Sequence, residues 1–134
     1  MTRINVIHPK RLTDQHLLAE YRALPRVFSL ARMDYNPVPR YTMGTGHVRF
    51  FYSRTGYLAA RQSAIIAECL SRGFDIAHRE SPTPVPGLSG DWVPSSKDIC
   101  VNLDRLRSKL IEKPEFYRYY GKIVTEGFYN DISG

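Results

Sequence analysis

Apolar side chains recur with helical spacing in three stretches of the chain. The first stretch follows Thr13, a suitable N-cap residue, and Asp14, whose carboxylate suits the first turn of a helix. Four apolar residues spaced four, three and four positions apart then mark one helical face: Leu17, Tyr21, Leu24 and Phe28. We predict a helix that runs to about Arg32. Pro25 lies inside it and is expected to bend it or to remove a hydrogen bond.

Two further helices follow from the same spacing. One is predicted from Tyr57 to Arg72, with Gly73 as its C′ residue. The other is predicted from Ser96 to about Glu112, and the proline-rich and glycine-rich residues 81–94 form a loop before it. We therefore expect a mostly α-helical fold. Residues 1–134 would form a single domain of three main helices with little or no β-sheet.

Polar side chains occupy the faces opposite these apolar stripes. Gln15, Arg22 and Arg26 fall on the far side of the first helix at about 100° per residue. Arg105 and Lys109 share an outer face of the third helix at i, i+4. A solvated helix face would show the same pattern, so spacing alone does not make these residues a binding site.

The charge of the chain favours a polyanionic partner. The formal net charge is +6, with 14 arginines against 5 lysines. Arginine binds phosphate bidentately and stacks on bases, and each phosphate contact releases condensed counterions. Nucleic acid is the natural candidate, although many basic domains bind none.

An aromatic and basic segment, Phe116–Lys122, allows two interpretations. Aromatic rings between basic residues can stack on bases while the cations hold the backbone. The same rings can instead dock into the hydrophobic core. We favour the core, because adjacent tyrosine and phenylalanine rings cannot all face solvent comfortably.

Several other classes of function find no support in the residues. No apolar run is long enough to cross a bilayer, and no secretory signal is visible, so we expect a soluble intracellular protein without a membrane partner. Cys69 and Cys100 cannot form a disulfide scaffold or a zinc site alone. The histidines lack metal-ligand spacing, which favours hydrogen-bonding structural roles for His16 and His47. We expect no metal and no cofactor.

One candidate nucleophile needs no side-chain motif. Removal of Met1 would expose the α-amine of Thr2. An α-amine has a pKa of about 7.7–8.0, so much of it is free base near neutrality and can attack a sugar C1′ carbon to give an imine. Many proteins begin Met-Thr, so this signal is weak by itself.

Separated blocks of the chain form a recognisable pattern: Thr2–Asn5, Leu12–Arg22 with Leu24–Phe28, Gly44–Val48 with Phe50–Tyr52, Ile66–Leu70 with Arg72–Phe74, and Tyr117–Lys122. In these blocks the chain resembles the phage and algal-virus pyrimidine-dimer DNA glycosylases of the endonuclease V type. The resemblance covers nearly the whole chain up to about Lys122, and the tail 125–134 has no clear counterpart.

This resemblance implies an enzyme that acts as a monomer on double-stranded DNA containing pyrimidine dimers or abasic sites. The Thr2 amine would attack C1′ of the 5′ pyrimidine, a base would be flipped out, and β-elimination would cut the strand. By position, eight residues would contact the lesion or its phosphates: Arg3, Gln15, His16, Tyr21, Arg22, Arg26, Arg105 and Lys109.

Residue 23 departs from the family pattern. The family has a catalytic glutamate between Arg22 and Leu24, and this chain has Ala23. Alanine can neither stabilise positive charge on the sugar nor remove a proton, so catalysis is expected to be impaired. The alternatives are a catalytically inactive module that binds damaged DNA, a lyase that acts only at abasic sites, and a nonspecific basic nucleic-acid binder.

Overall fold

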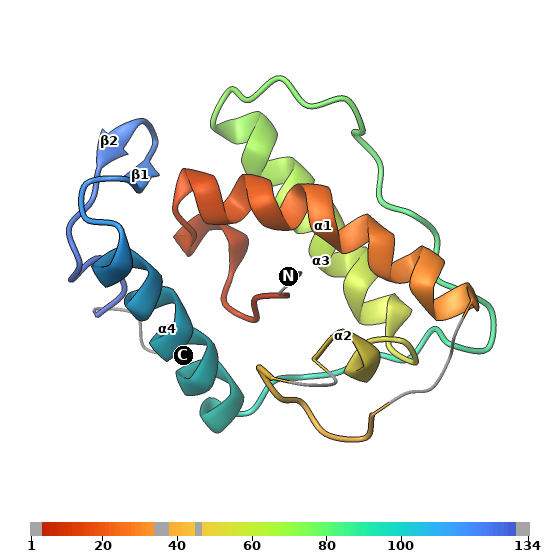
Figure 1. The fold of residues 1–134 in the computed structure, drawn as a ribbon. Helices are drawn as coiled ribbons and strands as arrows, with labels where there is room; N and C mark the ends of the chain where they lie inside the picture. Colours follow the sequence, from red (N-terminus) through yellow and green to blue (C-terminus); the bar gives the residue numbers. More distant parts are fainter. Residues whose placement is uncertain (1–3, 34–37, 45–46, 131–134) are drawn as a thin grey trace.

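The computed structural model describes residues 4–33, 38–44 and 47–130. The expected fold class is confirmed, because three long helices dominate and the strands are two residues each (Figure 1). A four-residue helix after the first long one was not predicted. In chain order the elements are the 3-10 helix η1 Pro9–Arg11, α1 Asp14–Met33, α2 His47–Phe50, α3 Thr55–Ser71, α4 Ser96–Glu112, β1 Arg118–Tyr119 and β2 Lys122–Ile123.

Helix α1 begins as its sequence predicts. The hydroxyl oxygen of Thr13 accepts a hydrogen bond from the His16 N–H at 3.2 Å, which caps the first turn. All four residues of the predicted apolar stripe are buried. Pro25 lies inside the helix, one residue from Leu24 of that stripe. The opposite face, which carries Arg22 and Arg26, is exposed.

Helix α3 begins at Thr55, two residues before the predicted start. The Thr55 hydroxyl donates to the carbonyl of Leu88 at 2.7 Å and accepts from the N–H of Val85 at 2.9 Å. The helix start is therefore fixed by a loop 30 residues further along the chain, which local spacing cannot reveal. At the other end Gly73 has φ of 82°, as expected for a C′ residue.

Helix α4 has the predicted bounds and a complete capping box. The Ser95 hydroxyl accepts from the Asp98 N–H, and the Asp98 carboxylate accepts from the Ser95 N–H. Leu103, Leu106 and Leu110 are buried. Its apolar stripe therefore faces the core, as the periodicity indicates.

The two strands form a tight antiparallel hairpin with Arg118 opposite Ile123 and Tyr119 opposite Lys122. The turn residues Tyr120 and Gly121 have φ of 52° and 80°. Two successive left-handed residues are what a two-residue hairpin turn requires. Glycine adopts this conformation freely, whereas tyrosine does so at a cost.

The N-terminal segment lies in the middle of the molecule. Helices α1 and α3 pack against each other, and residues 4–13 run between this pair and α4 (Figure 1). The buried apolar side chains form one continuous cluster that all three long helices share. After the hairpin the chain returns to the start of α1, where Tyr129 is fully buried.

Candidate functional site

The expected nucleophile and one of the expected contact residues, Thr2 and Arg3, lie outside the described residues. The described chain begins at Ile4, and residues 4–7 are buried. A buried backbone needs partners for its polar groups. Each of the four α-helices supplies one of these partners.

Helix α2 holds the first described residue. The Ile4 N–H donates to Nε2 of His47 at 2.8 Å, and Nδ1 of His47 lies 2.6 Å from the carbonyl oxygen of Thr42. His47 is 1% exposed. The prediction of a hydrogen-bonding structural role for this histidine is confirmed.

Helices α1 and α3 hold the next residues through a buried ion pair between Glu20 and Arg61. Glu20 Oε1 accepts from the side-chain amide of Asn5 at 2.8 Å and from the Arg61 guanidinium at 3.1 Å, and Arg61 Nε donates to Oε2. The other end of the guanidinium donates to the carbonyl of Ile7 at 2.8 Å. These contacts occupy both oxygens of Glu20, so this carboxylate is not free to serve chemistry elsewhere.

Helix α4 completes this arrangement with Asn102. Its Oδ1 accepts from the N–H of Val6 at 2.7 Å, and its Nδ2 donates to Oδ1 of Asn5 at 2.8 Å. We call Asn5, Glu20, His47, Arg61 and Asn102 the N-terminal polar cluster. A segment held from four helices has little freedom, so residues 4–7 have a fixed position.

Ala23 is half-buried on α1 beside the exposed Arg22. Its methyl group offers no donor, acceptor or charge. Glu20, the nearest carboxylate on the same helix towards its N-terminus, is committed to Arg61 and Asn5. Glu20 therefore offers no free carboxylate to the surroundings of Ala23.

A pocket of about 580 Å³ lies beside the exposed Arg22 of α1. Tyr21 forms one wall and is buried. Its hydroxyl donates to the carbonyl of His78 at 3.1 Å and accepts from the N–H of His78 at 2.8 Å. The pocket is lined by Tyr21, Arg22, Pro25, Gln62, His78, Glu80, Ser81 and Pro82. The sequence indicated Tyr21 and Arg22 but not the residues of α3 and of the 78–82 loop, since only the tertiary fold brings them together.

Two other predicted contact residues, Gln15 and His16, are engaged with the C-terminal part of the chain. The side-chain amide of Gln15 donates to the carbonyl of Phe116 at 3.0 Å and accepts from the N–H of Arg118 at 2.9 Å. The His16 ring stacks on Tyr117 at 4.5 Å, and its Nδ1 lies 2.8 Å from the hydroxyl of Tyr129.

The basic face of α4 lies close enough to His16 to change its titration. Burial, together with the smaller effect of the positive charges of Arg105 and Lys109, lowers the pKa of His16 to about 4. Lys109 also pairs with Glu112 at 3.4 Å. The structure thus gathers His16, Arg105 and Lys109 in one region, while Arg22 and Arg26 lie further along α1.

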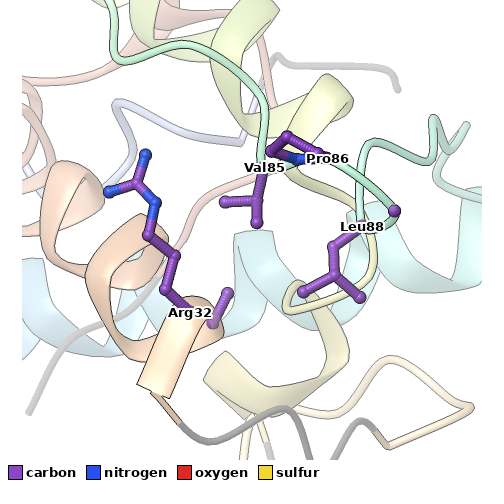
Figure 2. Close-up of a pocket in the computed structure, with 6 residues that line it drawn as sticks. Arg32, Val85, Pro86 and Leu88 are labelled. Atoms are coloured by element: carbon purple, nitrogen blue, oxygen red, sulfur yellow. The ribbon is translucent and has the colours of Figure 1, made fainter.

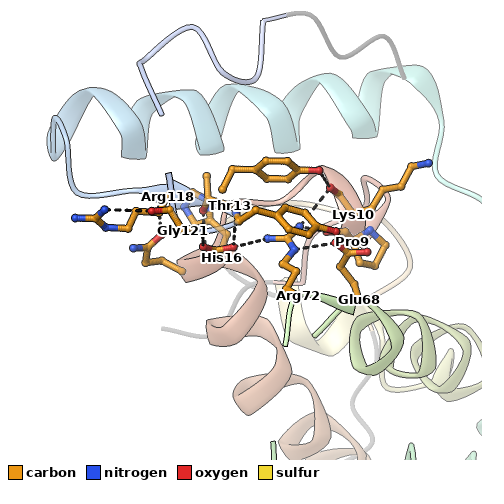
Figure 3. A network of polar contacts seen from close by, with 12 residues as sticks. Pro9, Lys10, Thr13, His16, Glu68, Arg72, Arg118 and Gly121 are labelled. Carbon is orange, nitrogen blue, oxygen red and sulfur yellow. Dashed lines mark hydrogen bonds and ion pairs between the residues drawn. The ribbon is translucent and has the colours of Figure 1, made fainter. Parts of the chain in front are cut away.

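A buried arginine holds the aromatic C-terminal segment in place (Figure 3). The Arg72 guanidinium pairs with Asp14 and Glu68, both at 2.8 Å, and lies against the rings of Tyr119 and Tyr120. We call these five residues the C-terminal polar cluster. The Asp14 carboxylate also accepts the N–H groups of the turn, at 3.1 Å from Tyr120 and 2.9 Å from Gly121, which stabilises the left-handed tyrosine.

Tyr117 is buried and Tyr119 is half-buried, while Phe116 and Tyr120 are exposed. The predicted docking of this segment into the core is therefore confirmed for Tyr117. Tyr119 is held through its hydroxyl, which donates to the carbonyl of Lys10 at 2.8 Å. For the exposed rings of Phe116 and Tyr120 the predicted docking into the core is wrong.

A second pocket, of about 360 Å³, opens at the C-terminal end of α1 (Figure 2). Ala31 and Arg32 line it from the helix, and residues 85–88 line it from the loop. None of the predicted contact residues that the structure describes lines this pocket.

The described part of the chain contains no cluster of three or more potential metal ligands. It also contains no helix long and apolar enough to span a bilayer.

The sequence model of one protein family matches residues 1–81, which is more than half of the chain. That family is described as pyrimidine dimer DNA glycosylase. The match includes α1, α2, α3 and four of the five residues of the N-terminal polar cluster.

Proposed function

The chain belongs to the pyrimidine dimer DNA glycosylase family, and from this we propose that it binds duplex DNA at cyclobutane pyrimidine dimers and cleaves the glycosidic bond of the 5′ pyrimidine. The observation that carries the proposal is the position of the exposed Arg22 of α1 on the wall of a pocket of about 580 Å³, whose lining residues, except Pro82, belong to the segment that matches the family. A basic helix face next to a pocket is suited to bind a phosphate backbone and to take in a nucleotide that leaves the stack.

Arg22 and Arg26 would bind phosphates on either side of the lesion, because both guanidiniums project from the exposed face of α1. The pocket lined by Arg22, Tyr21 and Pro25 would receive the flipped nucleotide. Its volume of about 580 Å³ lies within the range of about 300–1,000 Å³ typical of small-molecule sites.

A second set of contacts would come from α4 and the start of α1. Arg105 and Lys109 would bind the phosphate backbone, and Arg3, Gln15 and His16 would lie towards the lesion. With a pKa of about 4, His16 is neutral at pH 7, so it would contribute a hydrogen bond and not a charge. The amide of Gln15 would exchange its bonds to Phe116 and Arg118 if it contacts DNA.

The reaction would begin at the α-amine of Thr2 after Met1 is removed. The nitrogen lone pair attacks C1′, and the glycosidic bond breaks with its electron pair going to the pyrimidine, which then takes up a proton. Loss of a proton from nitrogen with opening of the sugar ring gives an imine, and removal of a 2′ proton expels the 3′ phosphate. The same amine would react with abasic sites.

Ala23 predicts that these steps are slow. A positioned charge or general base commonly contributes about 10²–10⁴ in rate, and Glu20 is held by Arg61 and Asn5. The second candidate function is therefore a module that binds damaged DNA without cutting it. A lyase restricted to abasic sites and a nonspecific binder are the remaining alternatives.

The test is borohydride trapping on UV-irradiated duplex, with Met1 removal first verified by mass spectrometry. We compare the protein with Ala23→Glu, and with Ala23→Gln as a control of similar size without the charge. Covalent adduct and strand scission with Ala23→Glu alone would support the proposal. Failure of all three proteins to react would leave a binding module, and equal affinity for irradiated and intact duplex would leave a nonspecific binder.

A further inference from the structure

His47 differs from the other members of the N-terminal polar cluster in where it contacts the chain. Glu20, Asn102 and Arg61 hold Asn5, Val6 and Ile7. His47 holds Ile4, whose N–H is the described backbone donor nearest in sequence to Thr2. We propose that His47 is a positioning residue that fixes where the reactive N-terminus enters the site. This inference rests on the proposed role of the Thr2 amine.

The tautomer of His47 follows from its partners. The carbonyl oxygen of Thr42, 2.6 Å from Nδ1, can only accept, so Nδ1 carries the proton. Nε2 therefore presents a lone pair, which accepts the Ile4 N–H at 2.8 Å. The ring is a neutral bridge between two backbone segments, one of which is the N-terminal segment at Ile4.

Aromatic neighbours fix the plane of this ring. Tyr41 and Phe51 meet it edge-on, with centroid distances of 5.6 Å for both. The ring is also fully buried. Because the ring cannot turn easily, the direction of its lone pair, and with it the position of the Ile4 nitrogen, is set by α2.

The chain connection makes this position important for the amine. Only one residue separates Ile4 from Thr2 in the sequence, and consecutive Cα atoms are about 3.8 Å apart, so the chain allows an amine at residue 2 only a short reach from the position of Ile4. A shift of Ile4 by about 1 Å would therefore shift the point from which the amine reaches its target. Misplacement of a reacting group by about 1 Å can cost 10²-fold in rate.

Two substitutions separate this role from a general role in folding. His47→Phe keeps an aromatic ring but removes the acceptor. His47→Gln restores an acceptor for Ile4 and a donor for Thr42. We measure imine formation by borohydride trapping on a duplex with an abasic site, together with the affinity for a tetrahydrofuran abasic analogue that cannot form an imine.

We expect His47→Phe to slow trapping by tenfold or more while its Kd for the analogue changes less than twofold, and His47→Gln to recover most of the rate. Trapping by His47→Phe at the unchanged rate would overturn the inference. So would equal losses in rate and affinity, because these would indicate general damage to the fold.

Amide hydrogen exchange supplies a readout that does not depend on activity. The Ile4 amide should be protected in the unaltered protein and exposed in His47→Phe, while amides of α3 stay protected in both. A freely exchanging Ile4 amide in the unaltered protein would overturn the positioning role and leave the proposed function intact. Absence of any imine from the protein and from Ala23→Glu would refute the proposed function, and this inference with it.

Discussion

Two buried arginines, Arg61 within α3 and Arg72 at the C-cap of the same helix, hold opposite ends of the chain by the same kind of contact. Each pairs with a carboxylate of α1, Arg61 with Glu20 and Arg72 with Asp14. Arg61 fastens the N-terminal segment through the carbonyl of Ile7. Arg72 fastens the C-terminal hairpin, which lies beyond the residues matched by the family.

The carboxylates of the two clusters differ in how much solvent they meet. The side chain of Glu20 is 1% exposed, whereas those of Asp14 and Glu68 are each 11% exposed. Removing the partner of a fully buried carboxylate leaves its charge without water, whereas a carboxylate that is partly exposed can be hydrated again. We therefore expect the N-terminal polar cluster to tolerate change least, and the C-terminal polar cluster to respond in a more local way.

The largest effect is expected from Arg61→Leu. It leaves the Glu20 carboxylate buried without its partner, so the free energy of unfolding should fall by about 3–5 kcal/mol. Urea unfolding followed by circular dichroism measures this loss. The double variant Arg61→Leu with Glu20→Leu should recover much of this loss. A loss below about 1 kcal/mol in the single variant would contradict the expectation, because it would show that Glu20 is hydrated without Arg61.

Arg72→Leu should cost less, about 2–3 kcal/mol, because charged hydrogen bonds are worth about 1.5–3 kcal/mol and the freed carboxylates can meet water. Its effect should concentrate on the hairpin. Limited trypsin digestion should cut at the exposed Lys122 sooner in this variant than in the unaltered protein. Unchanged digestion there would contradict the role assigned to Arg72.

Acidification should lower the free energy of unfolding through protonation of His16, which packs against the C-terminal residues Tyr117 and Tyr129. Its folded pKa of about 4 lies below its usual 6.5, so the unfolded chain binds the proton more readily and stability falls as pH drops through that window. The expected loss between pH 7 and pH 5 is about 2 kcal/mol, because each tenfold change in a protonation equilibrium is worth about 1.4 kcal/mol. His16→Gln should remove this part of the pH dependence of urea midpoints, and identical pH profiles would refute it.

The smallest effect is expected from Tyr129→Phe. The Tyr129 hydroxyl accepts the Thr13 N–H at 3.0 Å and contacts His16 Nδ1. Loss of such a hydrogen bond costs about 1 kcal/mol, which thermal unfolding can detect. Phe128 is half-buried beside Tyr129. Phe128→Ala is the control, because it changes the packing but leaves the Tyr129 hydroxyl in place, so the pKa of His16 should not change.

The helices could be predicted from the sequence because their signals are local. The spacing of the α1 stripe from Leu17 to Phe28, the Thr13 cap and the Gly73 C′ residue each act within one or two helical turns. Helix α2 was missed because four residues give no periodicity. The start of α3 was misplaced because Leu88 and Val85 fix it from a distant loop.

The candidate site divides in the same way. The exposed face of Arg22 and Arg26 follows from helical spacing, and the absent carboxylate at Ala23 is visible in the sequence. The partners of Gln15 and His16 at Phe116, Tyr117 and Tyr129 were not foreseeable, because they lie about 100 residues away. No local pattern encodes such a pairing.

The sequence by itself determined the helices, the basic exposed face and the family, since periodicity, capping and side-chain charge depend on neighbours in the chain. Tertiary structure decided which buried arginine holds which end of the chain, which residues line the pocket beside Arg22, and that His47 accepts the hydrogen bond of the Ile4 N–H. These outcomes depend on how helices pack, because burial raises the cost of every unpaired polar group and so selects the partners that the fold brings within reach.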